Sequence, residues 1–328
     1  MGYTIIDDAY YNSIIYWLKE QHGWNVKKEH IKYSPGVVPS LYASVLALTK
    51  PGDKIMVQTP VYYPFFSAVK ETGRELISNP LVLENGRYRM DIDDFRSKID
   101  NRTRMFFLCS PHNPGGNVWR RDELLAINKL CLEHNILVVS DEIHSDIVYP
   151  AFKHIPTASM SAEIDHNTVT LMAPSKTFNI AGLNSSYIIS SNDELLQKIS
   201  NHFEGMHIGA GIFSIEATKA AYFHGKEWLK DLISYFENNI SIVRTYLQQN
   251  LPEIKLIEPE ATYLLWLDFR KLNINRKELS DLLVNKAKLG LSDGFQFGED
   301  GNGFRRMNIG CPLSKVNEAM EAMGKVLK

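Results

Sequence analysis

The chain has 328 residues, of which 44% are hydrophobic and 23% charged, and its formal net charge is −2. These values exclude a disordered or collagen-like chain, and the balanced charge argues against nucleic acid as a partner. Three cysteines without a CxxC pair argue against a disulfide framework or thiolate metal site and favour a cytoplasmic protein. We see neither a signal-peptide pattern nor an apolar run near the ~18 residues that span a bilayer, so we expect no membrane association.

The first predicted element is an amphipathic helix between Asp7 and Gly23, with an acidic start and a glycine just past its end. Farther along, unbroken apolar runs alternate with helical patterns. Runs without polar alternation suit strands buried on both faces, and the alternation predicts an α/β protein with a doubly wound, mostly parallel sheet. The runs begin at Ile55, Met105, Ile136, Thr168 and Ser186.

A long helical pattern begins at Lys226 and ends before Pro252, because proline cannot continue a helix interior. We expect an N-terminal helix at residues 1–23, a large domain at 24–250 and a smaller α+β domain at 251–328. The strand-like and helical segments of the last part lie near Ile254, Leu264, Lys277, Met307 and Lys315.

Polar residues follow three of the predicted strands, at the edge where open α/β sheets bind ligands. Asn113 lies in SPHNPGG, Asp141 in SDEIH and Lys176 in APSKTFNIAGL. Taken singly, each suits an ordinary role as a turn residue, a strand-end cap or a surface lysine. Together they supply what pyridoxal phosphate (PLP) requires: a Schiff-base amine, a partner for the pyridine nitrogen and a donor to the ring oxygen.

The order and spacing of these motifs resemble those of a known family. Asn113 and Asp141 are 28 residues apart, and Asp141 and Lys176 are 35 apart. HNPGG, SDEIH and SKTFNIAGL are similar to the motifs of fold-type I PLP enzymes in the class I/II aminotransferase superfamily, and DEIH with SKTFNIAGL resembles the cystathionine β-lyase (PatB-type) branch. The resemblance covers nearly the whole chain and implies the fold-type I fold with a smaller C-terminal domain.

The resemblance assigns the contacts to the cofactor position by position. It implies that Lys176 holds PLP as a Schiff base and then moves the α-proton, while Asp141 keeps the pyridine nitrogen protonated. Asn113 matches the donor to the phenolic oxygen. Tyr62, the first tyrosine of TPVYYPF, matches the residue that stacks on the ring, although an aromatic side chain here also suits core packing.

The phosphate is expected at the start of the helix that follows Gly36, where the backbone amides of Val37 and Val38 can point at an anion. By itself, a glycine ahead of a helix indicates only a turn. The resemblance adds the hydroxyl of Ser175 to the phosphate contacts. It also implies a homodimer, because Tyr3 matches a residue that reaches the phosphate of the partner subunit.

Arg306 is the expected partner of the substrate carboxylate. Alternation along FRRMN places Arg306 and Asn308 on one face and Arg305 on the other, and the family's RxN pattern selects Arg306. The alternative role is a surface ion pair. His144 of DEIH either orients Asp141 or the ring oxygen, or is a core histidine; both remain open. The histidines show no metal-ligand spacing, so we expect no metal.

The sequence departs from the family pattern at two places. Asn184 stands where many fold-type I aminotransferases carry a phosphate-binding arginine, eight residues after the lysine, and the β-lyase branch commonly lacks that arginine too. Family members also begin with a WxADMDF-like segment lining the substrate site, and none precedes GYT here. We therefore expect complete cofactor contacts, whereas closure around the substrate depends on that segment.

The expected activity is PLP-dependent β-elimination from cystathionine or cysteine S-conjugates, giving a thiol, pyruvate and ammonia. An aminotransferase is the first alternative, because the same residues serve both reactions. A cofactor-binding regulatory protein with little turnover is the second alternative, based on the N-terminal departure. The motifs do not predict which thiol leaves.

Overall fold

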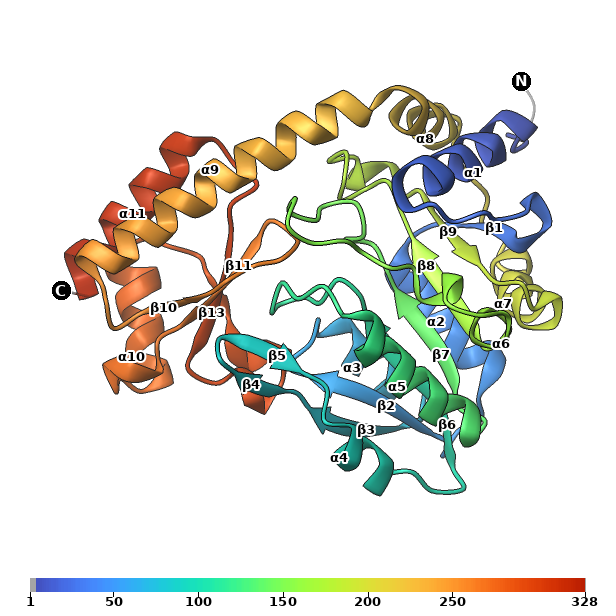
Figure 1. The fold of residues 1–328 in the computed structure, drawn as a ribbon, viewed down its shortest axis with the longest axis horizontal. Helices are drawn as coiled ribbons and strands as arrows, with labels where there is room; N and C mark the ends of the chain where they lie inside the picture. The colour runs from blue at the N-terminus through green and yellow to red at the C-terminus, as the bar shows by residue number, and fades with distance from the viewer. Residues whose placement is uncertain (1–3, 328) are drawn as a thin grey trace.

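The computed structural model describes residues 4–327, which form two main β-sheets with helices packed around them (Figure 1). The longer sheet belongs to the first two thirds of the chain and the shorter one to the C-terminal third. Helix α9 (Lys226–Asn250) runs from one part to the other. No helix in the described part of the chain is long and apolar enough to cross a bilayer.

The central sheet has seven strands in the order β1-β9-β8-β7-β6-β2-β3. Strands β8, β7, β6, β2 and β3 are parallel, while β9 is antiparallel to both of its neighbours. The expected mostly parallel sheet is therefore confirmed, and all five predicted runs are strands within it. Its members are β1 (Ile31–Ser34), β2 (Lys54–Thr59), β3 (Glu75–Pro80), β6 (Thr103–Cys109), β7 (Leu137–Asp141), β8 (Thr168–Met172) and β9 (Ser186–Ile189).

Helices cover both faces of this sheet, because successive side chains of a strand point to opposite sides. Val57 and Phe107 share one buried cluster with helices α2, α3 and α7, and Met56 and Phe106 share another with α4, α5 and α6. Burial on both faces explains the unbroken apolar runs. These helices are α2 (Val37–Leu48), α3 (Pro64–Lys70), α4 (Ile92–Ser97), α5 (Arg121–Glu133), α6 (Ala162–His166) and α7 (Asp193–Gly205).

Helix α1 (Asp8–His22) begins and ends as predicted. The carboxylate of Asp7 caps it by accepting the backbone N–H of Tyr10 at 2.9 Å. Gly23 ends it with a φ of 65°, a conformation that glycine adopts without strain. The buried face of α1 packs against helix α8 (Ile212–His224).

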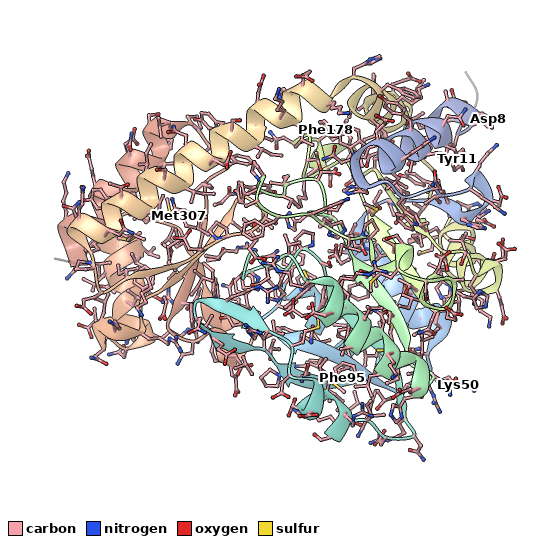
Figure 2. The ribbon with its side chains drawn as sticks, viewed as in Figure 1. Asp8, Tyr11, Lys50, Phe95, Phe178 and Met307 are labelled. Carbon is pink, nitrogen blue, oxygen red and sulfur yellow. The ribbon has the colours of Figure 1, made fainter. Side chains whose placement is uncertain are left out.

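The second sheet is antiparallel in the order β10-β11-β13-β12. Met307 of β13 is buried under α9 (Figure 2), and Phe236 and Val243 of α9 share its cluster. Helix α9 therefore shares a core with the C-terminal sheet, and the division at residue 250 stays a prediction. The elements here are β10 (Lys255–Ile257), β11 (Leu264–Asp268), α10 (Arg276–Ser280), a π-helical turn (Asp281–Lys286), β12 (Ser292–Asp293), β13 (Phe304–Asn308) and α11 (Leu313–Leu327).

Candidate active site

A cavity of about 340 Å³ brings together nine of the ten predicted site residues. The tenth, Tyr3, lies outside the described residues, so its role stays a prediction. The nine are Val37, Val38, Tyr62, Asn113, Asp141, His144, Ser175, Lys176 and Arg306.

The ends of three parallel strands explain the convergence. Cys109 ends β6 and pairs in register with Asp141, which ends β7. Strand β8, next to β7, ends at Met172, four residues before Lys176. Because the carboxyl ends of parallel strands share one edge, the loops that follow them carry Asn113 and Lys176 to the carboxylate of Asp141.

The carboxyl group of Asp141 is buried and receives one backbone hydrogen bond, from the N–H of Ile143 at 3.2 Å. Burial raises its pKa to about 7, because a buried carboxylate loses the hydration of its charged form. A cation beside the carboxylate would reverse this effect. A protonated pyridine nitrogen is such a cation, so the site suits PLP.

His144 is buried beside the same cavity, and among residues 4–327 nothing hydrogen-bonds its Nδ1. Burial lowers its pKa to about 3, so the ring is neutral. Its ring and that of Tyr263 meet edge to face, with centroids 5.9 Å apart. The structure shows no hydrogen bond from His144 to Asp141 among the described residues, and an unpartnered buried nitrogen is unusual for an ordinary core histidine.

Arg306 reaches across the cavity from β13 and donates a hydrogen bond from Nη1 to Oδ1 of Asn113, at 2.9 Å. No carboxylate of the described chain forms an ion pair with it, whereas the neighbouring Arg305 pairs with Asp293 at 3.1 Å. The expected alternation of the two arginines is therefore present. Arg306 offers an unpaired guanidinium to a ligand.

The start of helix α2, where the phosphate is expected, lines one end of the cavity. Gly36 is its N-cap, and no side chain of the described residues caps the helix there. The first amides of a helix have no intrahelical acceptor, so those of Val37 and Val38 are available to an anion. Ser175 and Asn184 line the same cavity. These groups together fit the phosphate, ring and aldehyde ends of PLP.

The cavity is also lined by residues outside the predicted set, among them Cys109, Tyr263 and Asn308. Cys109 ends a parallel strand, so the rule that selected Asp141 was also applicable to it. Asn308 shares the face of Arg306 by alternation. Tyr263 had no local signal, because its place depends on the preceding residue, Thr262, whose φ of 69° is rare for a β-branched side chain.

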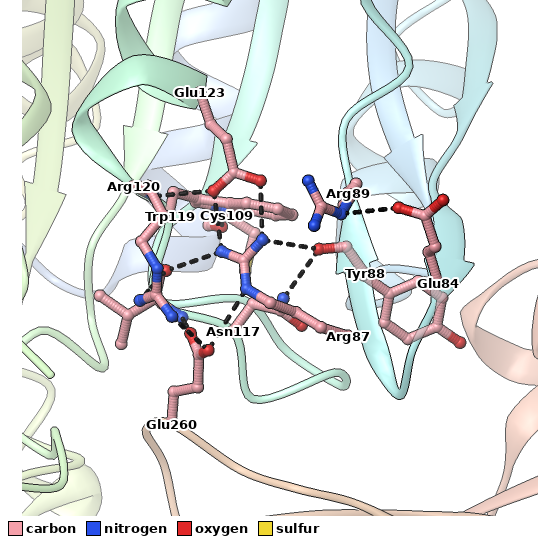
Figure 3. Close-up of polar contacts among 11 residues, drawn as sticks. Glu84, Arg87, Tyr88, Arg89, Cys109, Asn117, Trp119, Arg120, Glu123 and Glu260 are labelled. Carbon is pink, nitrogen blue, oxygen red and sulfur yellow. Dashed lines mark hydrogen bonds and ion pairs between the residues drawn. The ribbon is translucent and has the colours of Figure 1, made fainter. Parts of the chain in front are cut away.

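A partly buried ion cluster holds the loop of Asn113 against the segment before β11 (Figure 3). The carboxylate of Glu260 accepts from Arg120 at 2.7 Å, from Arg87 at 3.3 Å and from the backbone N–H of Val118 at 2.8 Å. The carbonyl of Gly116 accepts the backbone N–H of Glu260 at 3.0 Å. These contacts join two walls of the cavity that are distant in sequence. The hairpin of β4 (Val82–Glu84) and β5 (Arg87–Arg89) supplies Arg87.

Comparison with known proteins agrees with this geometry. Residues 1–323 match the family described as aminotransferase class I and II. The chain belongs to this family. A relative of this chain, cystathionine beta-lyase PatB of Bacillus subtilis, is 41% identical to it. The match covers 99% of this chain and 85% of PatB.

Solved structures give the same result. A PLP-bound putative aminotransferase from Clostridium difficile 630 is 45% identical to this chain, with a TM-score of 0.98. The match covers 100% of this chain and 85% of the aminotransferase chain. A PLP-bound C-S lyase from Staphylococcus hominis is 31% identical, with a TM-score of 0.94, covering 100% and 84%. This family member is therefore a PLP-dependent enzyme of fold type I.

Proposed function

We propose that this enzyme is a C–S β-lyase that cleaves cystathionine or S-substituted cysteines. The observation that carries the proposal is the unpaired guanidinium of Arg306 in the cavity that also holds the amine of Lys176 and the carboxyl group of Asp141. Such a cavity suits an α-amino acid, whose carboxylate has one bidentate partner and whose Cα lies near a base. The similarity to cystathionine beta-lyase PatB supports cleavage at sulfur.

Within this proposal, six residues besides Lys176 hold the cofactor. The amides of Val37 and Val38 and the hydroxyl of Ser175 bind its phosphate, and Asp141 pairs with its ring nitrogen. The amide nitrogen of Asn113 is the donor to the ring oxygen, since its Oδ1 already accepts from Arg306. The ring of Tyr62 lies against the cofactor ring.

PLP, when bound, withdraws electrons from the Cα of the amino acid. Arg306 binds the substrate carboxylate, and the amine of Lys176 takes the proton from Cα. The C–S bond then breaks, the sulfur leaves with the electron pair and takes up a proton, and the released aminoacrylate hydrolyses to pyruvate and ammonia. Because burial lowers the pKa of His144 to about 3, its ring adds no positive charge to the cavity.

The enzyme is further proposed to act as a homodimer in the cytoplasm. Several large apolar side chains in or just before α8 are exposed, including Met206 at 59%, Ile212 at 59% and Phe213 at 77%. Clustered exposed apolar groups of this kind are typical of protein interfaces. We expect a second copy of the chain to cover this face. The exposed Leu183 directly precedes Asn184, which lines the cavity, so a partner that covers Leu183 would also border the cavity. Light scattering of the double variant Ile212→Asp/Phe213→Glu is expected to show a weakened dimer, and an unchanged dimer would exclude this face.

The reaction type is tested by the need for an amino acceptor. The PLP-loaded protein is mixed with cystathionine, with and without a 2-oxo acid, and pyruvate and thiol are followed. Equal release of both products at a rate independent of the 2-oxo acid is expected. A strict requirement for the 2-oxo acid would show an aminotransferase instead, and binding without turnover would favour the regulatory alternative.

A further inference from the structure

Asp146 lies five residues after the end of β7 and is buried behind the loop of Lys176. Its carboxylate has three side-chain partners from distant parts of the chain. The hydroxyl of Thr177 donates to Oδ2 at 2.7 Å, the indole N–H of Trp17 donates to Oδ1 at 3.0 Å, and Nε2 of His22 lies 2.9 Å from Oδ1. Thr177 directly follows Lys176, so this carboxylate is bonded to the residue next to the proposed base.

The carboxyl group of Asp146 is ionised despite its burial. Burial alone would raise its pKa, but the hydrogen bonds of His22, Thr177 and Trp17 lower it below the usual range. Hydrogen bonds to an ionised acceptor are about twice as strong as neutral ones. The hydroxyl of Thr177 is therefore held firmly, and with it the backbone from which Lys176 projects.

Among the described residues, no hydrogen bond or ion pair holds Nζ of Lys176, although this amine must reach the Cα proton. The protein therefore positions the amine through the backbone of Lys176. Phe178, two residues after Lys176, packs against Trp17 of helix α1 with ring centroids 5.4 Å apart. Helix α1 therefore supports this loop directly at Phe178 and, through Asp146, at Thr177.

A chain of buried side-chain contacts links Asp146, through His22, to the residue next to Asp141. The ring of His22 meets the ring of His154 edge-on, with centroids 5.6 Å apart, and Nε2 of His154 lies 2.8 Å from Oε2 of Glu142. Glu142 directly follows Asp141 in the chain. Within the described residues, no three of the His, Cys, Asp and Glu side chains converge as a metal ion requires. These contacts connect the residue after Lys176 with the residue after Asp141.

We propose that Asp146 is a positioning residue for Lys176: through the hydroxyl of Thr177 it fixes the backbone that aims the amine, and helix α1 supports it through Trp17 and His22. This inference rests on the proposed role of Lys176 as the base. Displacing a reacting group by about 1 Å can cost about 100-fold in rate. Loss of the anchor therefore affects proton transfer more than substrate binding.

Thr177→Val removes the hydroxyl at nearly constant volume, and Thr177→Ser restores it. Thr218→Val is the matched control. Thr218, in helix α8, is also fully buried, and its hydroxyl lies 2.8 Å from the hydroxyl of Ser185. Each PLP-loaded variant is studied by two readouts: the visible absorption band of the bound cofactor during a pH titration, and exchange of the α-proton of L-alanine in D₂O. L-alanine has no leaving group, so exchange reports proton transfer without C–S cleavage.

We expect Thr177→Val to lower kcat for exchange about 10-fold, with KM within about 2-fold, and to shift the titration of the visible band. Thr177→Ser and Thr218→Val should stay within about 2-fold of the parent enzyme. Equal behaviour of Thr177→Val and Thr218→Val, or no recovery in Thr177→Ser, would overturn the proposal.

If Thr177→Val does not fold, Trp17→Phe provides the second test, since it keeps an aromatic ring against Phe178 and removes one donor to Asp146. A kcat lowered about 3-fold with an altered visible band is expected, and an unchanged enzyme would contradict the role of Asp146. The visible band also keeps the lyase proposal and the role of Asp146 distinguishable. If the parent enzyme binds PLP but releases no thiol, the lyase proposal fails. The effect of Thr177→Val on the band still tests the role of Asp146.

Discussion

Arg306 and Asn113, which are 193 residues apart in the sequence, are joined across the cavity by a hydrogen bond of 2.9 Å. The bond comes from a strand of the C-terminal sheet and ends on a loop of the central sheet. It orients the guanidinium that is proposed to bind the substrate carboxylate. It also leaves the amide nitrogen of Asn113 available as the proposed donor to the cofactor ring, so this one contact serves both proposed ligand sites.

Arg306→Lys is expected to raise KM for cystathionine about 10- to 100-fold, with a smaller effect on kcat. Lysine keeps the charge but loses the planar fork that grips a carboxylate at two points. Steady-state kinetics measure the effect. Arg270→Lys is the control, because Arg270 makes an ion pair with Asp268 at the surface, 2.8 Å long, away from the cavity. An unchanged KM in Arg306→Lys would show that Arg306 does not bind the substrate carboxylate.

Asp141 is expected to make the cofactor-free protein less stable as the pH rises. Its folded-state pKa of about 7 exceeds its usual value of 3.8. Between these values the folded state binds more protons than the unfolded state, so the free energy of unfolding falls with pH. Asp141→Asn removes this slope. Relative to the parent, the variant should gain about 2 to 4 kcal/mol between pH 4 and pH 8 in urea unfolding. An identical pH profile for both proteins would contradict the raised pKa.

Gly116→Ala is expected to destabilise the protein and weaken its affinity for PLP. Gly116 has a φ of 74°, and an added Cβ would lie 3.1 Å from the Cα of Pro259. Gly86→Ala is a matched control, with a φ of 78° and no described atom within 4 Å. The left-handed backbone alone costs about 1 to 2 kcal/mol. Gly116→Ala should cost about 2 kcal/mol more than Gly86→Ala in thermal unfolding; equal costs would mean that the two walls do not depend on this contact.

Much of the fold and site follows from local sequence rules. Asn113, Asp141 and Lys176 were predictable because buried apolar runs identify parallel strands, and the ends of such strands meet. The alternation of an antiparallel strand separated Arg306 from Arg305. The cap residues Asp7 and Gly23 marked the ends of α1, since capping acts over only a few residues.

The rest depends on contacts between distant segments. Tyr263 reaches the cavity because the backbone of Thr262 is in a rare conformation, and no local pattern predicts that conformation. The partners of Asp146 come from positions 17, 22 and 177, so its buried carboxylate resembles an ordinary loop residue in the sequence. The shared core of α9 and the C-terminal sheet likewise follows from packing, whereas Pro252 predicts only where the helix ends.

Lys176→Ala is expected to lose covalent attachment of PLP and at least about 1,000-fold in thiol release, because no other amine lines the cavity among the described residues. Borohydride reduction followed by mass spectrometry locates the attachment. The parent should carry the added mass on the peptide that contains Lys176. Attachment at another lysine would require a different base.

The most direct test of the account is the number of thiol molecules that each protomer releases from cystathionine when no 2-oxo acid is present. If one cavity uses Lys176, Asp141 and Arg306 for β-elimination, thiol and pyruvate should rise together, linearly, far beyond one equivalent per protomer. A plateau at or below one equivalent, with the cofactor left in its amine form, would contradict it.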